Sequence, residues 1–366
     1  MVLGRVLIAV PDVVTIRFEY SPVMALNNGL MIAHYEEAAL DGTERILQTL
    51  LAPLSSERKE IHGLVYGAFC NALPYVGEIS FPDFLKHFAT LDPTTLRNNA
   101  ISWLNQYEGF PGVEAILQTE ETLIGFMAHI AAQKGHEHED AYLRKSYSYL
   151  ADPALMKATM IEHMTYLWET FLEKEWSRHE TRLRQSVETY RQIDFGTFKS
   201  AYEAVEAITG RDMRHAEAMK EVLESYRRLV FVPSPYLGPY LSWHNEPHSD
   251  WKEAIIFFGP RQSEGVKKSP FASKRVELLV WMNALADDTR LQMLEMMLEE
   301  GEICAQDFID RLQLSQSSAS RHLRQLVTAG LITSRRQDVA KCYMLNQSRM
   351  GEFVQAIQHF TAKKSS

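Results

Sequence analysis

The residue types most suited to chemistry gather near the C-terminus, between Ser315 and Leu345. Five basic residues and one acidic residue give this stretch a local charge of +4, and serine, histidine and glutamine side chains accompany them. Guanidinium, amide and hydroxyl groups are the groups that contact base edges and phosphates of a duplex. The stretch therefore predicts binding of double-stranded DNA.

A helix from about Gln316 to Ala329, ended by Gly330, is expected to present these groups. At about 100° per residue, one side of this helix is apolar and the other is polar. The apolar side holds Ala319, Leu323, Leu326 and Val327, and the polar side holds Ser317, Arg321, Arg324, Gln325 and Thr328. The pattern is typical of a helix that reads a major groove.

Three shorter helices are expected before it, over about 276–285, 289–300 and 305–312. Asp287 and Asp288 supply a helix cap, Gly301 a stop, and Leu314-Ser315 the turn before the reading helix. The pattern predicts a helix-turn-helix.

Two strands, 332–336 and 340–345, should then form a hairpin around 337–339. Arg335, Arg336 and Lys341 stand at its tip and flanks, where they would meet phosphates or a minor groove. A final helix over 350–360 spaces Phe353, Ile357 and Phe360 along one face, as expected for a dimer contact. These elements complete a winged helix-turn-helix.

The stretches Ala284–Leu291, Leu314–Leu323 and Leu326–Ile332 resemble the ArsR/SmtB family of winged-helix repressors, over about a quarter of the chain. The resemblance implies a homodimer that reads an inverted repeat and releases it on an inducing signal. Its implied reading residues are Gln316, Ser317, Ser318, Ser320, Arg321 and His322. With the polar face and the hairpin, the expected DNA contacts extend to Arg324, Gln325, Arg335, Arg336 and Lys341.

A weaker similarity connects the N-terminal region with the long extension of some ArsR-like regulators. It rests on Ile16–Pro22 and on Trp168–Trp176, and it implies no particular ligand. The signal received by this region, a small molecule or a protein, stays open.

Thiol or metal sensing is an alternative that the cysteines leave open. Cys304 stands where metal sensors of the resembled family begin a pair of cysteines one residue apart, but the second position is Gln306. One thiolate cannot complete a tetrahedral site, and the final helix offers only Glu352 and His359. We therefore expect no metal or other cofactor, although Cys304 and Cys342 would form a redox or arsenical pair if the fold joins them.

Two further stretches, Gly135–Asp140 and Trp243–Asp250, hold ligand-type side chains in expected loops, without a zinc spacing. No nucleophile elbow or phosphate-binding glycine loop occurs in the sequence, so we expect no enzyme. An enzyme or scaffolding protein that uses the winged helix for protein contacts is the alternative, and a buried cluster of His244, His248 and Asp250 would favour the enzyme.

The length of 366 residues favours two or more domains, and the expected fold class is mainly α with small β elements. We expect a mostly helical sensor or interaction domain over 1–265, a linker over 266–274 and the winged helix-turn-helix over 275–366. Ser21-Pro22, Asp92-Pro93 and Asp152-Pro153 each sign the start of an N-terminal helix.

Short strands are expected at 14–20, 229–232 and 255–258, and we expect them to pair. After Asp152, the apolar spacing of Met160, Met164, Leu167 and Phe171 fits either a core stripe or the wall of a ligand cavity.

The net charge of −9 lies entirely in the first 274 residues, since eleven basic and eleven acidic residues balance from Arg275 onward. The cysteines are few and odd in number, which indicates a reducing compartment and no disulfide framework. No stretch is long and apolar enough for a membrane span, so we expect a cytoplasmic protein.

Overall fold

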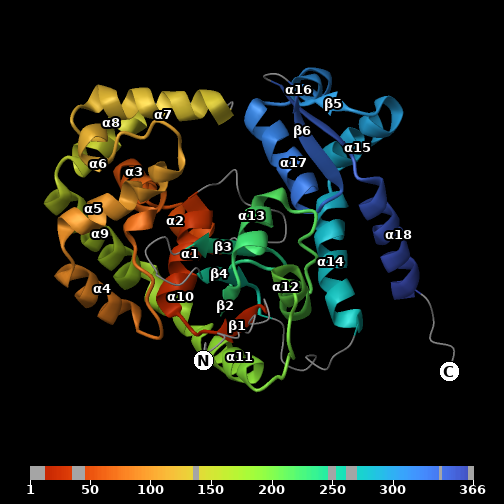
Figure 1. Cartoon of the computed structure of the whole chain (residues 1–366), viewed down its shortest axis with the longest axis horizontal. Helices are drawn as coiled ribbons and strands as arrows, with labels where there is room; N and C mark the ends of the chain where they lie inside the picture. Colours follow the sequence, from red (N-terminus) through yellow and green to blue (C-terminus); the bar gives the residue numbers. More distant parts are fainter. Residues whose placement is uncertain are drawn as a thin grey trace, which may run out of the picture.

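The computed structural model describes residues 13–34, 46–134, 140–245, 253–260, 270–337 and 340–361. Most of them are helical, and the strands form two small sheets, one in each part of the molecule (Figure 1). This arrangement confirms the expected fold class. In the described ranges, no helix has both the length and the apolar character that crossing a membrane requires.

The N-terminal part is built on a four-stranded mixed sheet with the strand order β1-β2-β4-β3. Strands β1 (Thr15–Phe18), β2 (Arg228–Pro233) and β4 (Glu253–Phe258) are parallel, which confirms that the predicted strands pair. Strand β3 (Leu241–Asn245) adds antiparallel to β4 at the edge. The expectation of a loop around Trp243 and His244 was therefore wrong, because these residues belong to β3.

Both faces of the central strands β2 and β4 are buried, as is usual for parallel strands. Phe231 and Phe258 belong to the large core on one face, where Phe18 stacks on Tyr190 of α11 (Glu180–Arg191) with ring centroids 5.0 Å apart. Val230, Val232, Ile255 and Phe257 form a smaller cluster on the other face with Met24 of α1 (Pro22–His34). Helices α1 and α11 therefore enclose the sheet.

The remaining N-terminal helices lie mainly to one side of the sheet (Figure 1). They are α2 (Ile46–Leu51), α3 (Ser56–Gly63), α4 (Phe81–Thr90), α5 (Pro93–Ile101), α6 (Val113–Ile116), α7 (Glu120–Lys134), α8 (Asp140–Leu150), α9 (Pro153–Leu167) and α10 (Glu173–Ser177). Short helical turns cover Leu64–Ala68, Cys70–Ala72, Ser102–Gln106 and Trp168–Leu172. Helices α12 (Ala201–Thr209) and α13 (Glu217–Ser225) stand between the sheet and the C-terminal part.

The predicted helix starts are confirmed by their caps. The carboxylates of Asp92 and Asp152 accept hydrogen bonds from the backbone N–H groups of Thr95 and Leu155, the third residues of α5 and α9, at 2.7 and 3.0 Å. Ser21 Oγ likewise accepts from the N–H of Met24 at 3.3 Å. Met160, Met164 and Leu167 of α9 are fully buried in the main core and Phe171 packs against it, so the stripe has a packing role.

The C-terminal part follows the predicted order of elements closely. Helices α15 (Asp288–Glu300), α16 (Ala305–Leu312) and α17 (Gln316–Thr328) precede the hairpin of β6 (Ile332–Gln337) and β7 (Ala340–Leu345) and the last helix, α18 (Gln347–Thr361). Gly301 and Gly330, at φ 87° and 73°, follow α15 and α17 with the left-handed backbone that favours glycine. A short strand that was not predicted, β5 (Ile303–Cys304), pairs with β7.

The first helix of this part, α14 (Pro270–Leu285), begins six residues before the predicted Val276. It therefore includes the last five residues of the expected linker, while 266–269 lie outside the described residues. Helix α14 packs on α12 of the N-terminal part. The division at 265 and 275 stays a prediction.

Candidate nucleic-acid interface

Helix α17 is fixed in place by its cap and by its apolar side. The Ser315 hydroxyl caps the helix by accepting a hydrogen bond from the N–H of Ser318 at 3.1 Å. Leu323 and Leu326 are buried in one cluster with Phe308 of α16 and Met293 of α15. These contacts hold the helix so that Gln316, Ser317, Ser320 and Arg321 stay exposed.

The N-terminal half of α17 presents a continuous polar surface. Gln316, Ser317, Ser320 and Arg321 are exposed, and Ser318 is half-buried. Arg324, one turn after Arg321, is also half-buried. A helix N-terminus with hydroxyl, amide and guanidinium groups is suited to enter a groove and contact base edges and phosphates.

Two residues expected to contact DNA are instead buried, and we correct their assignment. Gln325 is 2% exposed, and its amide donates to the hydroxyl of Tyr240 in the N-terminal part at 2.8 Å. His322 is 5% exposed, with Nδ1 3.4 Å from Oδ1 of Asp287, the residue that caps α15. His322 and Gln325 are thus occupied by contacts within the chain, which helical periodicity alone does not reveal.

The hairpin lies beside α17 and carries the remaining predicted cations. Arg336 pairs with Lys341 across the two strands. Lys341 is exposed, with Nζ 5.6 Å from the ring centre of Tyr343. The residues at the tip, 338–339, and the side chain of Arg336 lie outside the described set.

Arg335 has a partner that the sequence did not indicate. Its guanidinium forms two hydrogen bonds of 2.5 Å with the carboxylate of Glu302, just before β5. The side chain of Arg335 is 65% exposed in this pair. The hydrogen bond from Arg335 lowers the pKa of Glu302, so this carboxylate stays charged and competes with any phosphate for Arg335.

Cys304 and Cys342 face each other in the antiparallel pair of β5 and β7 and are joined by a disulfide. The fold therefore joins the two cysteines whose pairing the sequence left open. They form a disulfide, whereas the cysteine count had indicated reduced thiols. The bond ties the segment before α16 to the hairpin.

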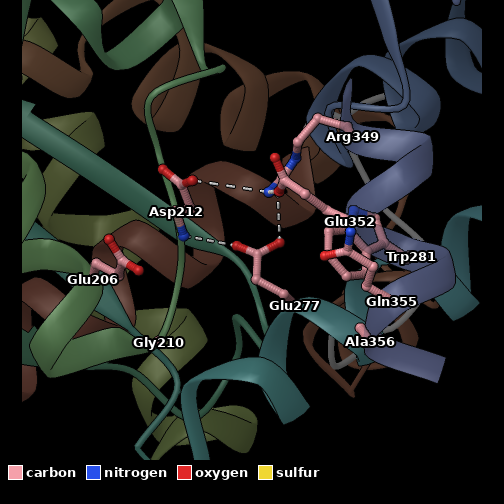
Figure 2. Close-up of a pocket in the computed structure, with 9 residues that line it drawn as sticks. All are labelled: Glu206, Gly210, Asp212, Glu277, Trp281, Arg349, Glu352, Gln355 and Ala356. Carbon is pink, nitrogen blue, oxygen red and sulfur yellow. Dashed lines mark hydrogen bonds and ion pairs between the residues drawn. The ribbon is translucent and has the colours of Figure 1, made fainter. Parts of the chain in front are cut away.

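A buried cluster of charges joins the N-terminal part to the winged helix (Figure 2). Glu277 of α14 accepts from Arg349 of α18 at 2.9 Å and from the N–H of Asp212 at 2.7 Å. Arg211 Nε lies 3.4 Å from the same carboxylate. These two arginines and Glu277 are each at most 7% exposed.

The cluster borders a cavity of about 240 Å³, which Glu206, Trp281 and Glu352 also line. Figure 2 shows Asp212, Glu277 and Arg349 pointing toward one another from three separate segments. No local sequence pattern marks these ion pairs, because their partners come from distant segments of the chain.

One group of potential metal ligands lies next to this cavity. Donor atoms of Asp212, His215 and Glu352 are all within 4.8 Å of one another, the only such group of three among the described residues. Arg349 donates to Glu352 at 2.6 Å, so the positive charge of the guanidinium already neutralises this carboxylate. His136 and His138, and likewise His248 and Asp250, lie outside the described residues.

The exposed half-helix, the hairpin and the helix-turn-helix that supports them define a winged helix-turn-helix DNA-binding transcription regulator. The model of the family described as "Bacterial regulatory protein, arsR family" matches residues 287–334. The arsenical resistance operon repressor of Staphylococcus aureus is 34% identical over 79 residues, which cover 22% of this chain and 75% of the relative. The chain belongs to the ArsR family.

Two other relatives show the breadth of the similarity. The arsenic resistance transcriptional regulator ArsR1 of Pseudomonas putida is 44% identical over 62 residues, 17% of this chain and 48% of the relative. The transcriptional activator HlyU of Vibrio cholerae is 32% identical over 79 residues, 22% of this chain and 72% of the relative. Each of these matches covers about a fifth of this chain, so they do not address the role of the larger N-terminal part.

Proposed function

We propose that the protein is a homodimeric one-component repressor, whose operator affinity is controlled by a signal received in the N-terminal part. The operator would be contacted by Gln316, Ser317, Ser318, Ser320, Arg321 and Arg324 of α17 and by Arg335, Arg336 and Lys341 of the wing. The observation that carries this proposal is the exposure of the N-terminal half of α17 beside a cationic hairpin, while His322 and Gln325 are buried.

The homodimer is supported by apolar side chains left on the outer side of the C-terminal part. Leu279 and Met282 of α14 are 47% and 44% exposed, and Val354 and Phe360 of α18 are 50% and 73% exposed. Helices α14 and α18 pack against each other, and Phe353 is used within the chain, edge-on to Trp281. Burial of this surface against a second copy would shield it from water.

Sedimentation velocity tests the dimer. Met282→Glu would place a charge in the contact and shift the protein to the monomer, whereas Leu155→Glu, at a residue 48% exposed on α9, would leave the dimer intact. A wild-type protein that sediments as a monomer at micromolar concentration would contradict the dimer.

Titration of a labelled fragment of the protein's own promoter tests DNA binding. Because Glu302 holds Arg335, we count Arg336 and Lys341 of each protomer as the wing cations that would meet phosphates in the wild type. About four counterions would then be released, and affinity would fall roughly a hundredfold between about 50 and 200 mM salt. Arg321→Ala should weaken specific binding by about 1–3 kcal/mol if Arg321 reads a base. Arg182→Ala removes an exposed arginine of α11 as the control.

The same affinity for promoter and unrelated DNA, or no salt dependence, would remove the proposal of operator reading. Equal losses in the Arg321 and Arg182 variants would remove the assignment of α17 as the reading helix.

A second candidate function, thiol sensing, is favoured by the position of Cys304 opposite Cys342. Reduction would release two thiols at the base of the wing, and these would bind arsenite as a pair. Arsenite should then change DNA affinity in the reduced wild type and in Cys70→Ser but not in Cys304→Ser. No effect on the wild type, or an equal effect on all three proteins, would exclude this candidate.

A further inference from the structure

A second cavity, of about 160 Å³, lies in the N-terminal part between α1, strands β3 and β4 and the turn at Cys70. Its walls are mostly apolar, with Met24, Met31, Leu73 and Phe257 among them. This size is close to that of a protein cavity that holds a benzene ring. The space therefore suits a compound with a single ring or a comparably small skeleton.

The polar side of this cavity is formed by Asn27, which is only 4% exposed. Neither its amide nitrogen nor its carbonyl oxygen has a hydrogen-bond partner. Its neighbour Asn28 donates to Ser242 Oγ of β3 at 2.9 Å, and the Asn28 carbonyl oxygen has no partner. Because a buried amide without partners is costly and uncommon in native proteins, the arrangement indicates a missing partner.

The chemistry of that partner follows from the carboxamide. It offers an acceptor and a donor side by side in one plane, and it pairs best with a group that presents a donor and an acceptor at the same spacing. Among the described residues, no acidic side chain, lysine or arginine lines the cavity. Burial lowers the pKa of His244 and raises that of Cys70, which favours the neutral form of each.

We propose that this cavity binds a small uncharged primary amide or lactam, with the ring or chain between α1 and β4 and the amide paired to Asn27. The binding itself is independent of the DNA-binding proposal, and only the role of the ligand as the controlling signal rests on it. An ordered water is the competing occupant, since water also supplies a donor and an acceptor.

Isothermal titration calorimetry with benzamide, toluene and benzoate tests the proposal on the full chain. Benzamide should bind, toluene should bind about ten- to a hundredfold more weakly because it lacks the paired amide, and benzoate should fail because its charge would be buried. Trp243 lines the cavity, so its fluorescence reports the same titration.

The matched variant is Asn27→Leu, which keeps the side-chain shape but removes both polar atoms. It should fold with equal or greater stability, lose benzamide binding by about ten- to a hundredfold and retain toluene. Asn105→Leu changes an exposed asparagine and should leave every affinity unaltered. Equal affinity of the wild type for benzamide and toluene, benzamide binding unchanged in Asn27→Leu, or binding of neither compound, as for a cavity that holds only water, would overturn the proposal.

The result is separable from the repressor proposal. Benzamide binding without specific binding to promoter DNA would contradict the repressor and leave the amide site. Specific DNA binding without benzamide binding would contradict the amide site and leave the repressor proposal.

Discussion

Replacing Glu277 with glutamine tests the buried charge cluster between the two parts of the molecule. Glu277 faces two arginines, Arg211 and Arg349, which are 3% and 2% exposed. Glutamine keeps an oxygen for the N–H of Asp212 but removes the negative charge, so two buried guanidiniums lose their common partner. Breaking a buried ion pair by removing one partner costs about 3–5 kcal/mol, and we expect Glu277→Gln to destabilise the protein by this amount.

The geometry also predicts an order among the variants. Arg349→Met leaves Glu277 paired with Arg211, so its cost should be smaller, about 1.5–3 kcal/mol for the lost charged hydrogen bonds. The double variant should cost less than the sum of the two single changes, because both remove the same contact.

Urea unfolding followed by far-ultraviolet circular dichroism measures these free energies of unfolding. Glu295→Gln, at an exposed position of α15, is the control and should change stability by less than about 0.5 kcal/mol. If Glu277→Gln and Glu295→Gln unfold at the same urea concentration, or if the Arg349 and Glu277 effects are additive, the cluster does not hold the two parts together.

Two further predictions concern the wing and the N-terminal core. Glu302→Gln should release Arg335, raise DNA affinity and steepen the salt dependence by up to about two charges per dimer, while Glu300→Gln, which removes the partner of Arg311, should not. Burial lowers the pKa of His163 to about 4 in the folded protein, whereas this histidine in the unfolded chain binds a proton below about pH 6.5. The free energy of unfolding therefore falls as the pH drops from about 6.5 to 4. Between about pH 6.5 and 5, the free energy of unfolding of His163→Gln should fall by up to about 2 kcal/mol less than that of the wild type. Urea unfolding at each pH measures both values, and equal losses would contradict a lowered pKa of His163.

The helix-turn-helix could be predicted from the sequence because its determinants are local. Ser315 and Asp287 cap helices through N–H groups three residues away, and Gly301 and Gly330 end them through their own backbone conformation. Each of these signals is contained within one turn of helix. The boundaries of α15, α16 and α17 therefore agree with expectation to within one residue.

The features that were missed depend on contacts between distant residues. Strand β3 exists because Ser242 and His244 pair with β4 about a dozen residues later, and its own sequence resembles a loop. Gln325 occupies the polar side of its helix, yet Tyr240 from the other part of the chain covers it. Periodicity identifies which side of a helix is polar, whereas it does not identify which polar side chain a distant segment of the chain buries.

Strand β3 also connects the cavity at Asn27 with helix α17. Tyr240, immediately before β3, accepts from Gln325 of α17, and Ser242 and His244 within β3 line the cavity beside Asn27. If a ligand in this cavity shifts β3, the contact between Tyr240 and Gln325 would pass the shift to α17. Under the proposed function, the ligand would then change operator affinity, and the operator would change ligand affinity by the same factor.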